Sequence, residues 1–200
     1  MTATEPKPKT SKSLVRVFGC LGIIVSIGGV LAFGLIQLRQ QVRLSFERSR
    51  QEWRQKSFDS VKRGDPSALV MDSKLLPMLA NDAECKKTVT RLDFASTEIA
   101  VSDASSVAEL PNVSSMTFYC TRGTKDLLLA ARTLPVTNLY FEMPDLSPES
   151  YLMLKDFPHL KKVRFEHVMD DEWIDRLKSE MPNVMIDAPF PRSNEPGYAK

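Results

Sequence analysis

The chain has 200 residues, a formal net charge of +2, three cysteines and two histidines. This length allows one modest domain with appendages, and a net charge so close to zero gives no sign of a nucleic-acid partner. Because the cysteines and histidines are too few for a disulfide framework or a closely spaced zinc site, we expect no metal and no cofactor.

After a basic N-terminal tail (residues 1–16), the first predicted element is an uncharged apolar run at residues 17–38. At about 1.5 Å per residue, a helix of this length spans the roughly 30 Å hydrocarbon core of a bilayer. Most of the eight glycines lie in this run, and glycine is better tolerated in membrane helices than in soluble ones. The sequence therefore predicts a single-pass membrane anchor, with a cleaved signal peptide as the alternative.

The orientation of this anchor is not fixed by charge, because basic residues flank the run on both sides. A short basic tail ahead of a first apolar helix usually stays in the cytoplasm, which places the C-terminal domain on the extracytoplasmic side. Two pairs, Gly22 with Ser26 and Gly28 with Ala32, have the small-xxx-small spacing that lets membrane helices approach closely. They predict weak self-association at most.

The next predicted element is a basic juxtamembrane helix over residues 39–64, because glycine and proline are absent until the stop signal at residues 64–66. Two interpretations of this helix remain open. Its arginines could meet anionic head groups, with Phe46, Trp53 and Phe58 at the membrane interface. Alternatively, it is a solvated stalk whose apolar residues pack on the following domain.

The remainder of the chain repeats every 23 or 24 residues. A large apolar residue followed by proline recurs, at Pro111, Pro135, Pro158 and Pro182. Short segments near these prolines carry apolar residues two positions apart: Leu92 and Phe94, Met116 and Phe118, Leu139 and Phe141, Val163 and Phe165. This period predicts strands with one face in a core. A shortened segment at residues 183–187 comes after the last proline.

A helical pattern lies between each strand and the next proline, with predicted N-caps at Ser102, Thr124, Ser147 and Asp170. One strand and helix cannot bury an apolar face alone, so several units must stack. The expected fold class is α/β: a short solenoid at residues 89–187 with parallel strands on one side and helices on the other. An N-terminal cap at residues 65–88 precedes it, and a disordered tail at residues 188–200 comes after it.

These units resemble leucine-rich repeats, whose signature runs LxxLxL. The matching positions are Val89-Leu92-Phe94, Val113-Met116-Phe118, Val136-Leu139-Phe141 and Leu160-Val163-Phe165, within residues 86–187. Family members often place Asn or Cys three positions after the last of these, to bond the backbone of the turn. This chain has Thr97, Thr121, Pro144 and Val168 there. An ordinary α/β domain with units of similar length is the alternative.

The resemblance implies a protein partner bound at the concave strand face, on the residues that alternate with the buried ones. The predicted protein-binding residues are Arg91, Asp93, Thr117, Tyr119, Asn138, Tyr140, Glu142, Lys162, Arg164 and Glu166. We expect Tyr119 and Tyr140 to be neighbours on adjacent strands, with Arg164 close by. Tyrosine and arginine are favoured in binding hot spots. A face that is merely solvated is the alternative.

The leading functional hypothesis is a non-catalytic, membrane-tethered protein-interaction module. A structural or assembly protein that self-associates through the membrane helix and stalk is the second, and an enzyme is the third, without a visible catalytic constellation. Cys85 and Cys120 either pair or remain free thiols. We expect His167 to be structural or solvated rather than a catalytic base.

Overall fold

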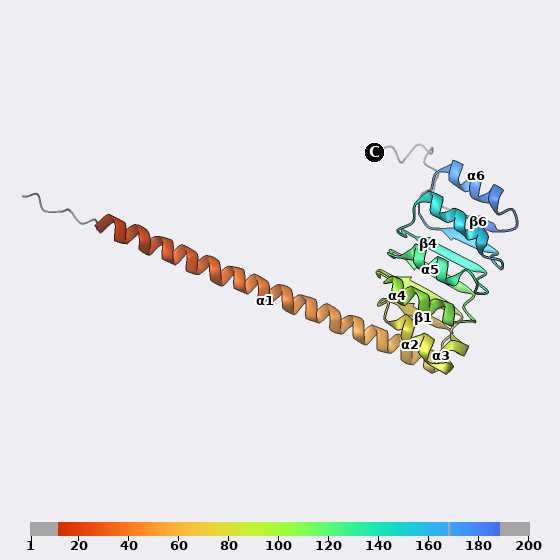
Figure 1. Cartoon of the computed structure of the whole chain (residues 1–200), viewed down its shortest axis with the longest axis horizontal. Helices are drawn as coiled ribbons and strands as arrows, with labels where there is room; N and C mark the ends of the chain where they lie inside the picture. The colour runs from red at the N-terminus through yellow and green to blue at the C-terminus, as the bar shows by residue number, and fades with distance from the viewer. Residues whose placement is uncertain (1–11, 168, 189–200) are drawn as a thin grey trace, which may run out of the picture. The chain divides into compact units, whose positions relative to one another are not determined.

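The computed structural model describes the backbone of residues 12–167 and 169–188, and the side chains of residues 34–167 and 169–188. The chain divides into two compact units, Met1–Arg48 and Ser49–Lys200. One helix, α1 (Lys12–Lys62), contributes residues to both units. Figure 1 shows the elements in chain order.

The described part of the first unit is the N-terminal portion of α1, which contains the predicted membrane span. Residues 17–33 of that span lie outside the part of the chain whose side chains are described, as do the predicted N-terminal tail at residues 1–16 and residues 189–200 of the predicted C-terminal tail. Among the described residues, no helix is long and apolar enough to cross a bilayer. The predicted helix after the span is confirmed: α1 continues to Lys62. Gly64, two residues after the end of the helix, has φ +101°, a left-handed conformation that glycine adopts readily.

The described part of the second unit contains one six-stranded sheet, in which the strands lie in chain order and all neighbours are parallel. The strands are β1 (Ser67–Val70), β2 (Arg91–Ala95), β3 (Ser115–Tyr119), β4 (Asn138–Glu142), β5 (Lys162–Phe165) and β6 (Met185–Asp187). The helical segments between them are α2 (Leu75–Asn81), α3 (Ala83–Thr88), α4 (Val101–Ala104), the 3-10 helices η1 (Ser105–Glu109) and η2 (Pro148–Asp156), α5 (Thr124–Ala131) and α6 (Asp171–Glu180). The predicted α/β class is confirmed.

The four predicted strands and the shortened one appear as β2 to β6, whereas β1 was not recognised in the sequence. It lies within the stretch predicted as an irregular cap, at residues 65–88. Ala68 and Val70 are its buried pair, and no large apolar-proline pair stands at the repeat distance to mark it. Because one of the two buried residues is alanine and the residue between them is leucine, the apolar residues of β1 show no alternation in the sequence. The strand is identified only by its pairing with β2 in the folded domain.

The core lies between the sheet and its helices, which succeed one another along the sheet in Figure 1 in the same order as the strands. Alternate strand residues and the inward residues of the helices, such as Leu127 of α5, Leu154 of η2 and Leu177 of α6, form one buried cluster. The other face of the sheet carries half-buried and exposed side chains. The helices therefore cover one face of the sheet and leave the second face open.

A ladder of phenylalanines runs through this core at one position of the repeat. Phe94, Phe118, Phe141 and Phe165 stand opposite one another in register. Their rings stack with centroids 5.3, 5.2 and 5.6 Å apart in that order. Tyr151 of η2 meets the last two rings edge-on, at 5.4 and 5.0 Å. The ladder explains why phenylalanine recurs as the last apolar strand residue: each ring packs on the next.

Two of the four predicted helix caps are wrong. The segment α4 begins after Ala100, so Ser102 lies inside it, and α5 is preceded by Gly123 rather than capped by Thr124. The Asp145 carboxylate, from the next turn, accepts hydrogen bonds from the backbone N–H groups of Gly123 and Thr124, at 2.7 and 3.1 Å. Because this cap comes from a distant residue, no local signal predicts it. Ser147 and Asp170 do occupy the predicted cap positions of η2 and α6.

The C-terminal part of α1 belongs to the second unit and packs on its core. Val61 is fully buried and Phe58 packs against the same cluster, while Arg54 Nη1 lies 2.7 Å from Asp72 Oδ2 in a half-buried ion pair. Packing on the domain is therefore the correct interpretation for Phe58, and a place at the membrane interface is wrong for it. Phe46 and Trp53 remain exposed, at 67% and 47%.

Candidate functional site

The candidate site is the open face, defined as the outward residues of β1 to β6. The strand register arranges them in rows: Arg91, Ser115, Asn138 and Lys162 form one row, and Asp93, Thr117, Tyr140 and Arg164 form the next. Ala95, Tyr119 and Glu142 begin a third row, which Glu166 continues after β5. All ten residues predicted for binding therefore lie on one surface, because alternation along parallel strands is set locally.

The C-terminal half of the open face holds a connected group of side chains. Tyr140 stands opposite Arg164, whose guanidinium lies 5.8 Å from the centre of the tyrosine ring. Arg164 Nε donates a hydrogen bond to Glu166 Oε1 at 2.5 Å. Asp187 Oδ2 lies 3.7 Å from Arg164 Nη1 and 3.8 Å from Lys162 Nζ. This arrangement holds an aromatic ring and a guanidinium side by side at the surface.

The electrostatics of this group favour a fixed arrangement of charges. The hydrogen bond to Glu166 raises the pKa of the Arg164 guanidinium, despite partial burial. Burial, followed by the hydrogen bond to Glu166, raises the pKa of the Tyr140 hydroxyl, which therefore stays protonated at neutral pH. Ion pairs as exposed as these contribute little to stability. These contacts join Tyr140, Arg164, Glu166 and Asp187 into one group on the open face.

The two tyrosines sit on adjacent strands as predicted, but in different rows. Tyr119 stands opposite Glu142, and Tyr140 stands opposite Thr117, so the two rings are diagonal neighbours. The prediction that Arg164 lies close to Tyr140 is confirmed. At the other end of the face, Arg91 Nε lies 2.8 Å from Asp93 Oδ1.

Three residues at the ends of the open face were not predicted from the sequence. Leu69 of β1 is 39% exposed and Met185 of β6 is 63% exposed, while Asp187 joins the Arg164 group. The period of two through β6 was the available signal for Met185 and Asp187. For Leu69 the signal was too weak, because its strand was not recognised.

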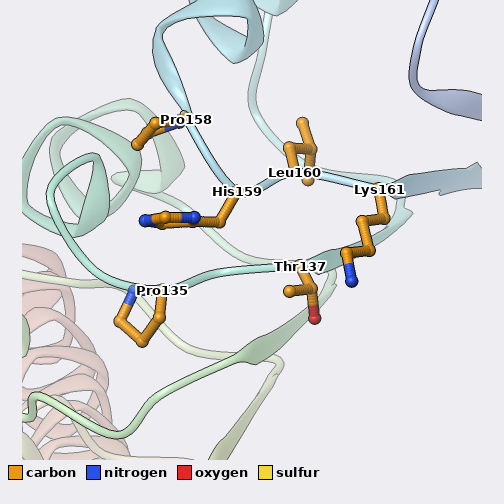
Figure 2. A pocket seen from close by; sticks show the side chains of 6 residues that line it. All are labelled: Pro135, Thr137, Pro158, His159, Leu160 and Lys161. Atoms are coloured by element: carbon orange, nitrogen blue, oxygen red, sulfur yellow. The ribbon is translucent and has the colours of Figure 1, made fainter.

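A hollow with a volume of about 380 Å³ lies at the amino ends of β4 and β5. Figure 2 shows the side chains that line it. Two of the repeating prolines, Pro135 and Pro158, line it on either side of the His159 ring, and Lys161 lies beside Thr137. The Thr137 carbonyl oxygen accepts hydrogen bonds from the backbone N–H groups of Lys161 and Lys162, at 2.9 and 3.0 Å. These contacts belong to the repeat itself, so the hollow is a by-product of stacking two similar loops.

The other histidine, His167, is held inside the domain beside the phenylalanine ladder. Its Nε2 lies 3.3 Å from the Tyr151 hydroxyl, and its Nδ1 lies 3.4 Å from the Phe141 carbonyl oxygen. A neutral ring with its proton on Nδ1 satisfies both contacts, since Nδ1–H donates to the carbonyl and Nε2 accepts from the hydroxyl. Burial lowers the pKa of this imidazole.

We expect His167 to make folding pH-dependent. Because its folded-state pKa lies below the ordinary 6.5, the unfolded chain binds more protons as the pH falls below that value, and stability declines on acidification. Denaturant unfolding between pH 8 and pH 5 measures this slope. The His167→Asn variant should show a shallower slope than wild type. His159→Asn, at an exposed histidine, is the matched control, and an equal change in both variants would contradict the assignment.

Among the described residues, no three His, Cys, Asp or Glu side chains gather as a metal site would require. Cys85 is a buried free thiol and Cys120 a half-buried one, so the two do not pair. No family model matches the sequence, and no curated protein matches it either.

Proposed function

We propose that this chain is a membrane-tethered, non-catalytic interaction module of the leucine-rich-repeat type, which binds a protein partner through the open face. The observation that carries the proposal is the half-buried group of Tyr140, Arg164 and Glu166 on a sheet face that none of the described helices covers. Residues of this kind, held in place and partly desolvated, dominate protein interfaces. Preorganisation also reduces the entropy lost on binding.

The repeat-type assignment is supported by recurring backbone detail. The residue after each of three consecutive strands is left-handed: Ser96, Cys120 and Met143 have φ of 47°, 46° and 50°. At the turn position where family members often carry Asn or Cys, the Thr121 hydroxyl donates to the Tyr119 carbonyl at 3.2 Å. This bond takes the place of the one expected from the family's amide or thiol. Pro144 has no side-chain donor for this role, and Val168 lies outside the described residues.

Membrane tethering is the second part of the proposal, with the anchor at residues 17–38 and the domain on the extracytoplasmic side. Its support is the uncharged apolar run together with the exposure and charge of the neighbouring residues in α1. Leu35, Ile36 and Leu38 are 61%, 54% and 57% exposed, an arrangement unfavourable for a helix in water and favourable in lipid. Arg39 and Arg43 come directly after them, where anionic head groups would lie.

A substitution in the open face tests the proposal. Full-length chain in mild detergent is used to capture partners, comparing wild type with the Tyr119→Ala/Tyr140→Ala/Arg164→Ala variant by quantitative mass spectrometry. We expect specific partners to fall by about tenfold or more, since each hot-spot truncation typically costs about 2 kcal/mol or more. The control is Lys125→Ala/Arg132→Ala/Lys178→Ala, three exposed residues at the helices. Equal capture by both variants would refute the open-face assignment.

Self-association through α1 is the second candidate function, favoured by a seam on the exposed helix. Leu35, Val42 and Phe46 are spaced seven and four residues apart and are all exposed, as at an unpaired coiled-coil edge. Cross-linking of the same preparations discriminates between the two functions. A dimer that persists in the open-face variant, together with unchanged partners, favours assembly; a monomer that loses its partners favours the interaction module.

A further inference from the structure

A separate pocket lies just past the carboxyl ends of β2 and β3, entirely within the second unit. It has a volume of about 240 Å³ and is lined by Arg50, Ser96, Thr97, Glu98, Cys120 and Arg122. Arg50 comes from α1, and the other residues come from two consecutive turns of the repeat. The turns are fixed to each other by backbone hydrogen bonds from Arg122 N–H to the Thr97 carbonyl at 2.9 Å and from Ile99 N–H to the Arg122 carbonyl at 3.0 Å.

The two arginines of this pocket have no carboxylate partner within the described part of the chain. Other arginines there do, as in the pairs of Arg54 with Asp72 and of Arg91 with Asp93. Two guanidinium groups that line one small pocket repel each other, and an anion between them relieves that repulsion. Guanidinium groups are also the donors best shaped to hold the two oxygens of a carboxylate or a phosphate.

The second observation is the hydroxyl of a buried threonine. Thr97 is only 5% exposed and lines the pocket, but its hydroxyl has no hydrogen-bond partner within the described residues. At the equivalent position of the next unit, the Thr121 hydroxyl donates to the Tyr119 carbonyl at 3.2 Å and lies 3.5 Å from the Phe94 carbonyl. The Thr97 oxygen is not among the fully buried side-chain atoms that lack a partner, so it is open to the interior of the pocket, where most such hydroxyls bond water or a ligand. The Thr97 hydroxyl therefore has a free donor for a group inside the pocket.

We propose that this pocket binds a carboxylate group, held by Arg50 and Arg122 and by a hydrogen bond from the Thr97 hydroxyl. The carboxylate of Glu98, which also lines the pocket, limits the negative charge that a ligand can carry there. Two guanidinium groups and one carboxylate leave the pocket with a single net positive charge, which matches a carboxylate. A phosphate monoester carries about −1.5 to −2 at pH 7 and would be repelled by Glu98. The site does not depend on the open-face proposal.

The test uses the isotope-labelled full-length chain in detergent micelles, with backbone amide shifts of residues 96–98 and 120–122 as the readout. The probes are sodium acetate, acetamide and inorganic phosphate at matched ionic strength. We expect acetate to shift these amides in a saturable manner, acetamide to leave them unchanged, and phosphate to bind more weakly than acetate. Tighter binding of phosphate, or an equal response to acetamide, would overturn the carboxylate assignment.

Variants locate the site. Arg122→Gln and Arg50→Gln should each weaken acetate binding about tenfold or more, the usual loss for one charge-assisted hydrogen bond. Thr97→Val should weaken it as well without lowering the thermal stability, because the hydroxyl has no internal partner to lose. Arg132→Gln, at an exposed arginine just after α5 and outside the pocket, is the control. Unchanged affinity in both pocket arginine variants would refute the site.

Two peptide probes identify the source of the carboxylate. N-acetyl-trialanine has a free C-terminal carboxylate, and its C-terminal amide is the matched control. If the peptide acid binds more tightly than acetate while the amide does not bind, the ligand is the C-terminus of a polypeptide, captured as in other carboxylate-binding modules. If acetate binds as tightly as the peptide, the pocket takes a free small carboxylate. Binding of neither acid overturns the proposal, whatever the partner capture shows.

Discussion

Phe118→Ala should lower the free energy of unfolding by about 3–5 kcal/mol, the usual cost of removing a buried phenylalanine from a core. Phe118 is fully buried and stacks on Phe94 on one side and on Phe141 on the other, at 5.3 and 5.2 Å. The substitution would leave a cavity in the middle of the ladder. Because β3 is hydrogen-bonded to β2 and β4 in a fixed register, the flanking strands cannot move together to fill it. Since small domains are stable by only about 5–15 kcal/mol, a large fraction of the stability is lost.

Denaturant unfolding followed by circular dichroism measures this effect, with Phe118→Leu as the matched control. Leucine retains most of the volume and loses the stacking, which is about 0.5–1.5 kcal/mol for each aromatic pair. The control should therefore cost clearly less than the alanine variant. A loss below about 1 kcal/mol for Phe118→Ala would mean that the ring is not an essential part of the core.

Gly123→Ala should destabilise the domain by about 2–4 kcal/mol, from backbone strain and a steric clash together. Gly123 has φ +76°, and a Cβ at this position would lie 2.6 Å from the Ile99 carbonyl oxygen. That oxygen belongs to the backbone of the preceding unit, so it cannot move aside as a flexible side chain would. The shift required would also disturb the bond from the Gly123 N–H to Asp145.

Gly64→Ala is the matched control for this prediction. Gly64 is also left-handed, with φ +101°, but a Cβ there would meet no atom within 4 Å. The control should therefore show only the conformational cost of about 1–2 kcal/mol. Equal losses of thermal stability in the two variants would mean that the contact with Ile99 is not rigid. The left-handed Ser96, Cys120 and Met143 show that this backbone shape by itself is tolerated.

Much of the candidate site could be predicted because strand alternation is a local property. Once Leu92 and Phe94 are assigned to the core, Arg91 and Asp93 must face the other way, and the same holds for each later strand. Arg164 was expected close to Tyr140, but the row that places Tyr140 opposite Thr117 and Arg164, and Tyr119 opposite Glu142, was not predicted. It depends on the register between strands, and a shift of two residues preserves every buried position while it changes every neighbour.

Local patterns in the chain were sufficient to predict the repeat, the strands β2 to β6, the end of α1 and the division between a buried and an open face. These features arise from apolar spacing, proline positions and a glycine stop, which act within a few residues of the chain. The folded domain was needed to show how Asp145 caps α5, how α1 packs through Phe58 and Val61, and how Arg50, Thr97 and Arg122 come to line one pocket. Such contacts join segments tens of residues apart, where local patterns carry no information about distance.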